Sequence, residues 1–252
     1  MVETHTLIAH AHALLDADAV RDWSPNGLQV EGRHEVRRLM TGVTACQPLL
    51  EAAVEWQADM VLVHHGWFWK GEPSRVIGMR RRRMQTVLGA DINLVAYHLP
   101  LDIHPDLGNN AELGRLFEIE VEGRVDAGGI PGLLWHGRLA DTLTPEAFAA
   151  RIAAVLGRQP VHLGPQGGSI RRVAWCSGAA HDLLEQAHEL GVDAFVTGEV
   201  AERTTHLARE LGLHCLAAGH HATERCGVRA LGEHLAARFD IEHRFVDIDN
   251  PV

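Results

Sequence analysis

The strongest constraint on the fold is an internal repeat. The segment RRLMTGVTACQPLLEAAVEWQADMVLVHHG begins at Arg37, and RRVAWCSGAAHDLLEQAHELGVDAFVTGEV begins 134 residues later, at Arg171. Aligned without a gap, the two segments share polar as well as apolar residues, at Arg37/Arg171, Arg38/Arg172, Ala45/Ala179, Leu49/Leu183, Leu50/Leu184, Glu51/Glu185, Ala53/Ala187, Glu55/Glu189 and Asp59/Asp193. Chance similarity between two α/β units would reproduce the hydrophobic pattern alone. The shared polar residues favour an internal duplication.

Short apolar runs alternate with helical patterns along the chain, which predicts an α/β fold with largely parallel strands. Strands are expected at residues 38–43, 60–63, 92–96, 161–163, 173–176, 194–197, 214–217 and 245–248. Helices are expected at residues 6–15, 48–56, 75–88, 110–117, 145–156, 181–190, 201–211 and 225–238. The sequence therefore predicts repeated units of strand, helix and strand.

A glycine-rich stretch between Gly123 and Gly137 is typical of a turn cluster and of a domain boundary. We therefore expect two similar, linked α/β domains, one over residues 1–125 and one over residues 126–252. The C-terminal segment is expected to pack back on the first domain.

Composition excludes several classes of protein. No apolar run approaches the roughly 20 residues of a membrane helix, and the N-terminus lacks the basic region of a secretion signal. We therefore expect a cytoplasmic protein with no membrane partner. The formal net charge of −10 argues against tight binding of duplex nucleic acid. None of the 4 cysteines forms a C-x-x-C pair, which argues against a zinc knuckle.

Histidines and carboxylates follow several of the expected strands, where sites form in parallel α/β sheets. Of the 18 histidines, the informative ones stand in such positions with nearby acids: His64, His65, His98, Asp102, Glu199, His220, His221 and Glu224. Imidazole and carboxylate ligands suit Zn, Fe, Mn, Co or Ni. Because these candidates outnumber the ligands that one catalytic metal takes from protein, the pattern predicts two divalent metal ions per chain.

The repeat extends into these motifs. NLVAYHLPLD aligns with CLAAGHHATE, so that His98 lies over His220 and Asp102 over Glu224. At the start of a helix, His220 and Glu224 share one face and can converge on one metal. His64 and His65 would point in opposite directions on a strand, but at a strand end beside Gly66 they could reach two different metals.

Two further segments are candidates for substrate contact. Trp67 and Trp69 directly follow the histidine pair, and they could wall a pocket or equally serve packing or subunit contact. Arg80 and Arg81 begin a run of four arginines that could form an anion-binding rim or simply a solvated helix face.

Taken together, these motifs resemble one known family. HHG after a strand, HLPLD-x-H-x-x-x-G-N-N at 98–110, TGE at 197–199, GHHATE-x-x-G at 219–227 and W-x-x-N-G-L-Q-V at 23–30 are similar to motifs of the NIF-three-like dinuclear metal-centre proteins. This family is also called GTP cyclohydrolase I type 2. The resemblance covers essentially the whole chain.

The resemblance implies two linked α/β domains with two metals between them and a ring-shaped homohexamer. It implies that His64 binds one metal, and His65 and Asp102 the other. His220 would join the metal of His64, and Glu224 would bridge both. His98, Glu199 and His221 would lie near the site, with His98 as a candidate proton-transfer residue or as a group that orients Asp102.

The leading functional hypothesis is a metal-dependent hydrolase acting on a small molecule, a nucleotide or a related phosphorylated compound. In the GTP cyclohydrolase case, water activated by the metals would attack the guanine C8. The alternatives are a non-enzymatic metal-binding scaffold or regulator and a metal-trafficking protein. A closed ligand shell would favour the scaffold, because catalytic sites keep a position open. Weakly held, exchangeable metal would favour trafficking.

Overall fold

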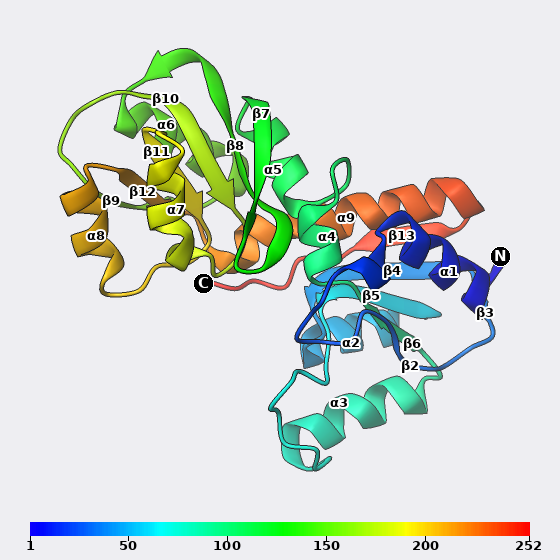
Figure 1. Ribbon diagram of the computed structural model, residues 1–252. Coiled ribbons are helices and arrows are strands. Elements are labelled where there is room, and N and C mark those ends of the chain that lie inside the picture. Colours follow the sequence, from blue (N-terminus) through cyan, green and yellow to red (C-terminus); the bar gives the residue numbers. More distant parts are fainter. The chain divides into compact units, whose positions relative to one another are not determined.

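The computed structural model describes all 252 residues and shows a mixed α/β fold, as predicted (Figure 1). The chain divides into two units. Unit 1 comprises Met1–Gly108 and Gly227–Asp249, and unit 2 comprises Asn109–Cys226 and Asn250–Val252. Each unit has its own sheet with apolar clusters on both faces. None of the helices has the length and apolar character needed to cross a membrane.

Unit 1 is built on a five-stranded sheet in the order β13-β4-β5-β6-β2. Its strands are β2 (Gly27–Val30), β4 (Arg38–Thr44), β5 (Met60–His65), β6 (Asn93–Ala96) and β13 (Glu242–Phe245). The first four in sheet order are parallel, and β2 runs antiparallel to β6. A separate antiparallel pair joins β1 (Val2–Glu3) to β3 (Glu35–Val36). Its helices are α1 (Thr4–Leu14), η1 (Ala17–Ala19), α2 (Gln47–Glu55), α3 (Gly78–Gly89), α4 (Leu99–Ile103) and most of α9 (His220–Phe239).

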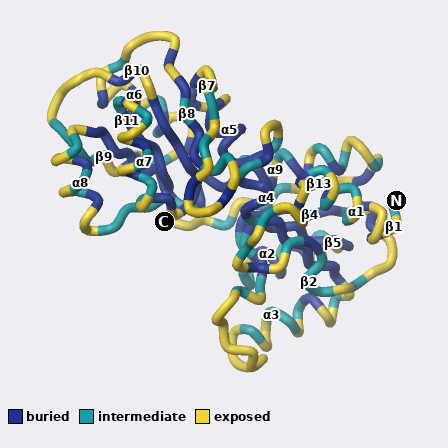
Figure 2. The backbone as a smooth tube through the Cα atoms, viewed as in Figure 1, coloured by how far each residue is buried: buried dark blue, intermediate teal, exposed yellow.

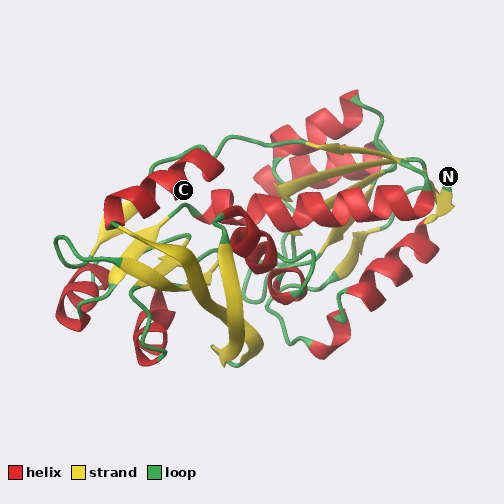
Figure 3. Ribbon diagram, turned by 90° about the horizontal axis from the view of Figure 1, so that it is seen from above, coloured by secondary structure: helices red, strands yellow, loops and turns green.

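Alternation along β5 sorts its side chains between the two faces of this sheet. Met60 and Leu62 belong to the apolar cluster that includes residues of α1 and α9. Val61 and Val63 belong to the cluster that includes residues of α2 and α3. Figure 3 shows helices on both sides of these strands, and Figure 2 shows β4 and β5 buried, whereas the loop before α3 is exposed. Alternation alone would send His64 and His65 toward opposite faces. At the end of β5, however, their ring centroids lie only 4.6 Å apart.

Unit 2 is built on a six-stranded mixed sheet in the order β7-β8-β10-β11-β12-β9. Its strands are β7 (Ile119–Ala127), β8 (Ile130–Leu143), β9 (Val161–Leu163), β10 (Ile170–Cys176), β11 (Ala194–Thr197) and β12 (His214–Ala217). Only β10, β11 and β12 are parallel to one another. Its helices are α5 (Asn109–Leu116), α6 (Pro145–Leu156), η2 (His181–Leu183), α7 (Leu184–Glu189), α8 (Thr204–Leu211) and the first residues of α9.

The polar residues shared by the two repeats make the same hydrogen bonds in both units. Asp59 Oδ2 accepts from the backbone N–H groups of Arg37 at 2.8 Å and Arg38 at 2.9 Å. Asp193 Oδ2 accepts from those of Arg171 at 2.9 Å and Arg172 at 2.8 Å. Strand register agrees as well, because Leu39 pairs with Met60 and Val173 pairs with Ala194. Asp59 thus links the start of β5 to the start of β4, and Asp193 links the start of β11 to the start of β10.

The match fails by one residue after the third strand. Asn93 pairs with Met60, and His214 pairs with Ala194, so Asn93 corresponds to His214 rather than to Cys215. The following helices begin at Leu99 and His220. By strand register, His98 therefore corresponds to Gly219, and the predicted superposition of His98 on His220 is wrong by one position. The sequence alignment missed this shift because both segments contain an apolar strand followed by a histidine.

Other differences concern regions where the sequence signal was ambiguous. The glycine-rich stretch forms the turn of the β7–β8 hairpin inside unit 2, so the units divide at Gly108. Antiparallel pairing of β7, β8 and β9 makes the second sheet mixed rather than largely parallel. The last strand begins three residues earlier than expected, at Glu242, and it pairs with β4.

Candidate metal centre

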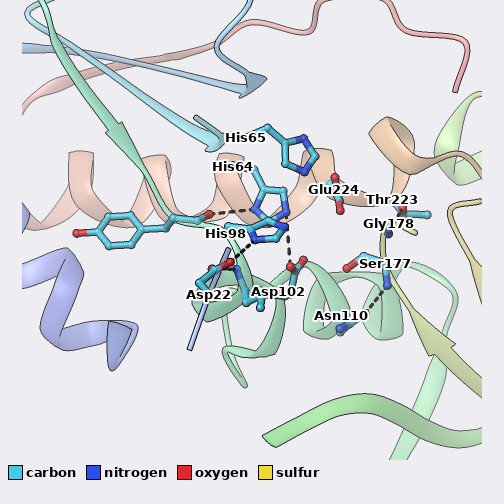
Figure 4. A network of polar contacts seen from close by, with 12 residues as sticks. Asp22, His64, His65, His98, Asp102, Asn110, Ser177, Gly178, Thr223 and Glu224 are labelled. Carbon is cyan, nitrogen blue, oxygen red and sulfur yellow. Dashed lines mark hydrogen bonds and ion pairs between the residues drawn. The ribbon is translucent and has the colours of Figure 1, made fainter. Parts of the chain in front are cut away.

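His64 is the most enclosed histidine of the candidate set, with a fully buried side chain. Its Nδ1 lies 3.0 Å from the backbone oxygen of Tyr97 (Figure 4). Because a carbonyl only accepts hydrogen bonds, this contact places the imidazole proton on Nδ1. The other nitrogen, Nε2, faces Asp102 Oδ2 at 3.5 Å. Ligating histidines in metalloproteins are held in the same manner, by a hydrogen bond from the ring nitrogen that does not bind the metal.

Asp102 reaches His64 from helix α4. Its backbone N–H donates to the oxygen of His98, and the side chain is 6% exposed. Proline at the second helical position, Pro100, favours helix initiation directly after the strand. The turn that starts at His98 thereby places a carboxylate against the end of β5.

His98 is held in a fixed orientation by Asp22. The His98 Nδ1 donates to Asp22 Oδ1 at 2.8 Å, and its backbone N–H donates to Asn26 Oδ1 at 2.8 Å. Asp22 also accepts from Asn26 Nδ2 at 3.1 Å and from the backbone N–H of Leu99 at 3.0 Å. The proton on Nδ1 leaves Nε2 with its lone pair exposed to the rest of the cluster.

The charge of Asp22 is stabilised despite its burial. Burial by itself would raise the pKa of this carboxyl, but the hydrogen bond from His98 and the electrostatic interaction with its ring, with the hydrogen bonds from Asn26 and Leu99, lower the pKa to about 2. The carboxylate is therefore ionised at neutral pH and available to fix the His98 ring.

Three imidazoles of unit 1 converge at the end of β5. Ligand nitrogens of His64, His65 and His98 lie within 4.8 Å of one another. The ring centroids of His64 and His65 are 4.6 Å apart, and those of His64 and His98 are 5.0 Å apart. Together with Asp102, the donor set of imidazole nitrogens and a carboxylate oxygen fits a first-row transition metal or zinc.

In unit 2, a second group of ligand candidates lies at the start of α9. The Nε2 of His220 lies 3.1 Å from Glu224 Oε2, and its Nδ1 contacts Glu199 Oε1. His220 and Glu224 are one helical turn apart, which is why they share a face. Burial by itself would lower the pKa of His220, but the hydrogen bonds and charges of Glu224 and then Glu199 raise the pKa to about 9. The two carboxylates thus favour a positive charge at the position between them.

Gly178 makes room for Glu224. It has a φ of +65°, and a Cβ built on it would lie 2.3 Å from Glu224 Oε1. Its N–H donates to Thr223 Oγ1 at 3.1 Å, and the preceding N–H, of Ser177, donates to Asn110 Oδ1 at 2.9 Å (Figure 4). The loop after β10 is thereby fixed against the carboxylate, and only glycine fits at its tip.

The remaining predicted site residues have varied surroundings. Trp67, Trp69 and Arg80 line one cavity beside His65, whereas Arg81 is exposed on α3 and does not line it. His221 is 8% exposed, and its backbone N–H donates to the oxygen of Val252. Glu199 contacts His220.

Sequence reasoning missed two residues that build the site. Asp22 stands just before the W-x-x-N-G-L-Q-V segment, and only the fold brings it to His98. Gly178 carries no motif of its own, although a glycine two residues after the end of a strand is a usable signal for a close approach. The W-x-x-N-G-L-Q-V segment itself supports the site, because Asn26 binds the backbone of His98 and Gln29 Oε1 accepts from the N–H of Trp67 at 2.6 Å.

Comparison with known proteins places this chain among close relatives. In Pseudomonas aeruginosa, a protein named GTP cyclohydrolase 1 type 2 homolog is 54% identical over 246 residues, which cover 98% of this chain and 97% of that protein. A protein of the same name in Escherichia coli is 50% identical over 238 residues, covering 94% of each chain.

Two solved structures also match over their whole length. One, described as protein ybgI of unknown function, has a TM-score of 0.96 and 48% identity, with both chains covered at 100%. The other, TTHA1606 from Thermus thermophilus, has a TM-score of 0.89 and 34% identity at the same coverage. The family described as Duf34/NIF3 (NGG1p interacting factor 3) matches residues 2–251. This chain therefore belongs to the Duf34/NIF3 family.

Proposed function

We propose that the protein is a dinuclear, divalent-metal-dependent hydrolase that acts on a nucleotide or a related phosphorylated aromatic compound. The observation that carries the proposal is the convergence of His64, His65 and His98 with Asp102 at the end of β5. The name of the relatives, GTP cyclohydrolase 1 type 2 homolog, agrees with such a reaction class.

The residues proposed to hold the ions are His64, His65, Asp102, His220 and Glu224, and the Glu224 carboxylate would serve both ions. The hydrogen bond from His64 to Tyr97 and the buried carboxylates support this set. In unit 1, Asp102 lies against His64, whereas the family resemblance assigns it to the ion of His65. When bound, two divalent ions would supply Lewis-acid chemistry and an activated water.

The residues around these ligands would bind and orient a substrate and move its protons. Asp22 holds the Nδ1 proton of His98, so that Nε2 can accept a proton within the cluster. The cavity beside His65 offers indole surfaces for a planar ring. Addition of water to guanine C8 with cleavage of the C8–N9 bond would open the imidazole ring and leave N7 formylated. Hydrolysis of this formamide by a second water would release formate.

A direct assay tests the function. The protein is stripped with a chelator, reloaded separately with Fe, Zn, Mn, Co or Ni, and incubated with GTP while guanine absorbance and formate release are followed. Turnover that requires one of these metals supports the proposal. No turnover of GTP or of simple phosphoesters with any metal would instead favour a scaffold.

We expect His98→Asn to keep its metal and to lower the turnover rate by roughly 10²–10⁴-fold, the usual size of a general acid–base contribution. Asp22→Asn should reproduce part of this loss, because it removes the acceptor that fixes the His98 tautomer. Metal content is measured beside the rate, and His5→Asn, an exposed histidine of α1 that pairs with Glu31, serves as the control.

Two outcomes would change this assignment. An unchanged rate in His98→Asn with full metal content would remove His98 from the mechanism. Loss of metal would make His98 a ligand, and the set of five ligands would need revision. Assembly into a cytoplasmic homohexamer stays a prediction, which light scattering on the purified protein would address.

A further inference from the structure

A cavity beside His65 is formed within unit 1 by the loop from Gly66 to Ile77 and by helix α3. Its volume is about 360 Å³, at the lower end of the range for pockets that hold small molecules. Three consecutive aromatic residues of the loop, Trp67, Phe68 and Trp69, line it. We call this space the tryptophan cavity.

Both indole rings of the tryptophan cavity are fixed by the backbone. Trp67 Nε1 donates to the oxygen of Ala45 at 3.0 Å, and Trp69 Nε1 donates to the oxygen of Gly66 at 3.1 Å. Because their polar N–H groups are already satisfied, these rings offer carbon surface to a ligand. Trp69 also lies edge-on to His98, with ring centroids 4.9 Å apart, and His65 itself lines the cavity, so the cavity borders the histidine cluster of unit 1.

Two arginines of α3, Arg80 and Arg83, line the tryptophan cavity, and only Arg80 forms an ion pair with a carboxylate. Arg80 pairs with Glu72 at 2.8 Å and donates to the oxygen of Pro73, so that it ties the loop to the helix. Arg83 has no carboxylate partner, and its Nε is buried without a hydrogen-bond partner. A guanidinium that is partly withdrawn from water and unpaired is suited to an anionic ligand.

We propose that the tryptophan cavity is an anion-and-ring subsite, in which Arg83 binds the anionic group of a planar aromatic substrate and the three aromatic residues bind its ring. The substrate class is an aromatic compound that carries a phosphate or a carboxylate. The inference rests on the proposed function only in treating the cavity as the substrate site of that enzyme.

Binding to metal-free protein tests the subsite separately from hydrolysis. The full chain, stripped of metal, is titrated calorimetrically with 1-naphthyl phosphate, 1-naphthoate, 1-naphthol and inorganic phosphate. We expect 1-naphthyl phosphate or 1-naphthoate to bind about 10- to 100-fold more tightly than 1-naphthol, as expected for a charge-assisted hydrogen bond. Their ratio identifies the preferred anion. Inorganic phosphate should bind at least about 10-fold more weakly, because it lacks the stacking ring.

Arg83→Gln should reduce the affinity for the naphthyl anion to that for 1-naphthol and leave 1-naphthol binding unchanged. Arg81→Gln is the matched control, since Arg81 carries the same charge on the same helix but is exposed outside the cavity. Equal anion affinity in wild type and Arg83→Gln, or an equal loss in both variants, would overturn the proposal. Metal-dependent turnover without binding of the naphthyl anions would contradict the proposed subsite but not the proposed hydrolase. Binding of these anions without turnover would contradict the hydrolase but not the subsite.

Discussion

Replacing Glu224 by glutamine is expected to release both metal ions from the protein. The carboxylate is 2% exposed and lies 3.1 Å from His220 Nε2, so its charge is available to cations rather than to solvent. If it bridges two ions, its neutralisation weakens both sites at once. We expect a loss of metal affinity of roughly 100-fold or more, beyond the effect of removing a residue that only supports a ligand. Elemental analysis after dialysis measures the outcome.

Two variants make this result interpretable. Glu233→Gln changes an exposed glutamate on the same helix and should keep its full metal content. Asp102→Asn should lose metal less readily than Glu224→Gln, because Asp102 is proposed to serve one ion. Native-like metal content in Glu224→Gln would show that Glu224 is not a ligand.

Gly178→Ala is expected to lose metal although no proposed ligand is replaced. The added Cβ would lie 2.3 Å from Glu224 Oε1, so the carboxylate must move. The positive φ of +65° adds backbone strain of about 1 kcal/mol or more for a residue other than glycine. Thermal unfolding and elemental analysis together separate these two effects.

Gly157→Ala provides the matched control for Gly178→Ala. Gly157 has a φ of +73° at the end of α6, and a Cβ there would meet nothing within 4 Å. It should therefore lose a comparable amount of stability from strain and keep its metal. If Gly178→Ala keeps metal as Gly157→Ala does, the loop after β10 does not position Glu224.

The duplicated part of the fold was open to prediction because its signals are local. Apolar runs defined β11 and β12 to the residue, and the aligned Asp59 and Asp193 proved to make matching hydrogen bonds. The β7–β8 hairpin was not predicted, because its strands alternate exposed charges with half-buried residues around a glycine turn. Such a pattern is equally typical of a linker.

The site could be predicted where its residues are of types that bind metals and follow predicted strands. Histidines and acids after strands indicated metal ligands, and the structure brings His64, His65, His98 and Asp102 together in unit 1. Asp22 could not be found in this way, because its role depends on a contact with a residue 76 positions later. The one-residue slip between His98 and His220 likewise appears only in the strand register.

The most direct test of the dinuclear centre is an anomalous difference map from crystals of the metal-loaded protein, measured beside elemental analysis of the same preparation. We predict two ions per chain, one of them bound by His64, with His65, Asp102, His220 and Glu224 completing the protein ligands and Glu224 contacting both ions. A single ion, or ions bound by residues outside this set, would contradict the account.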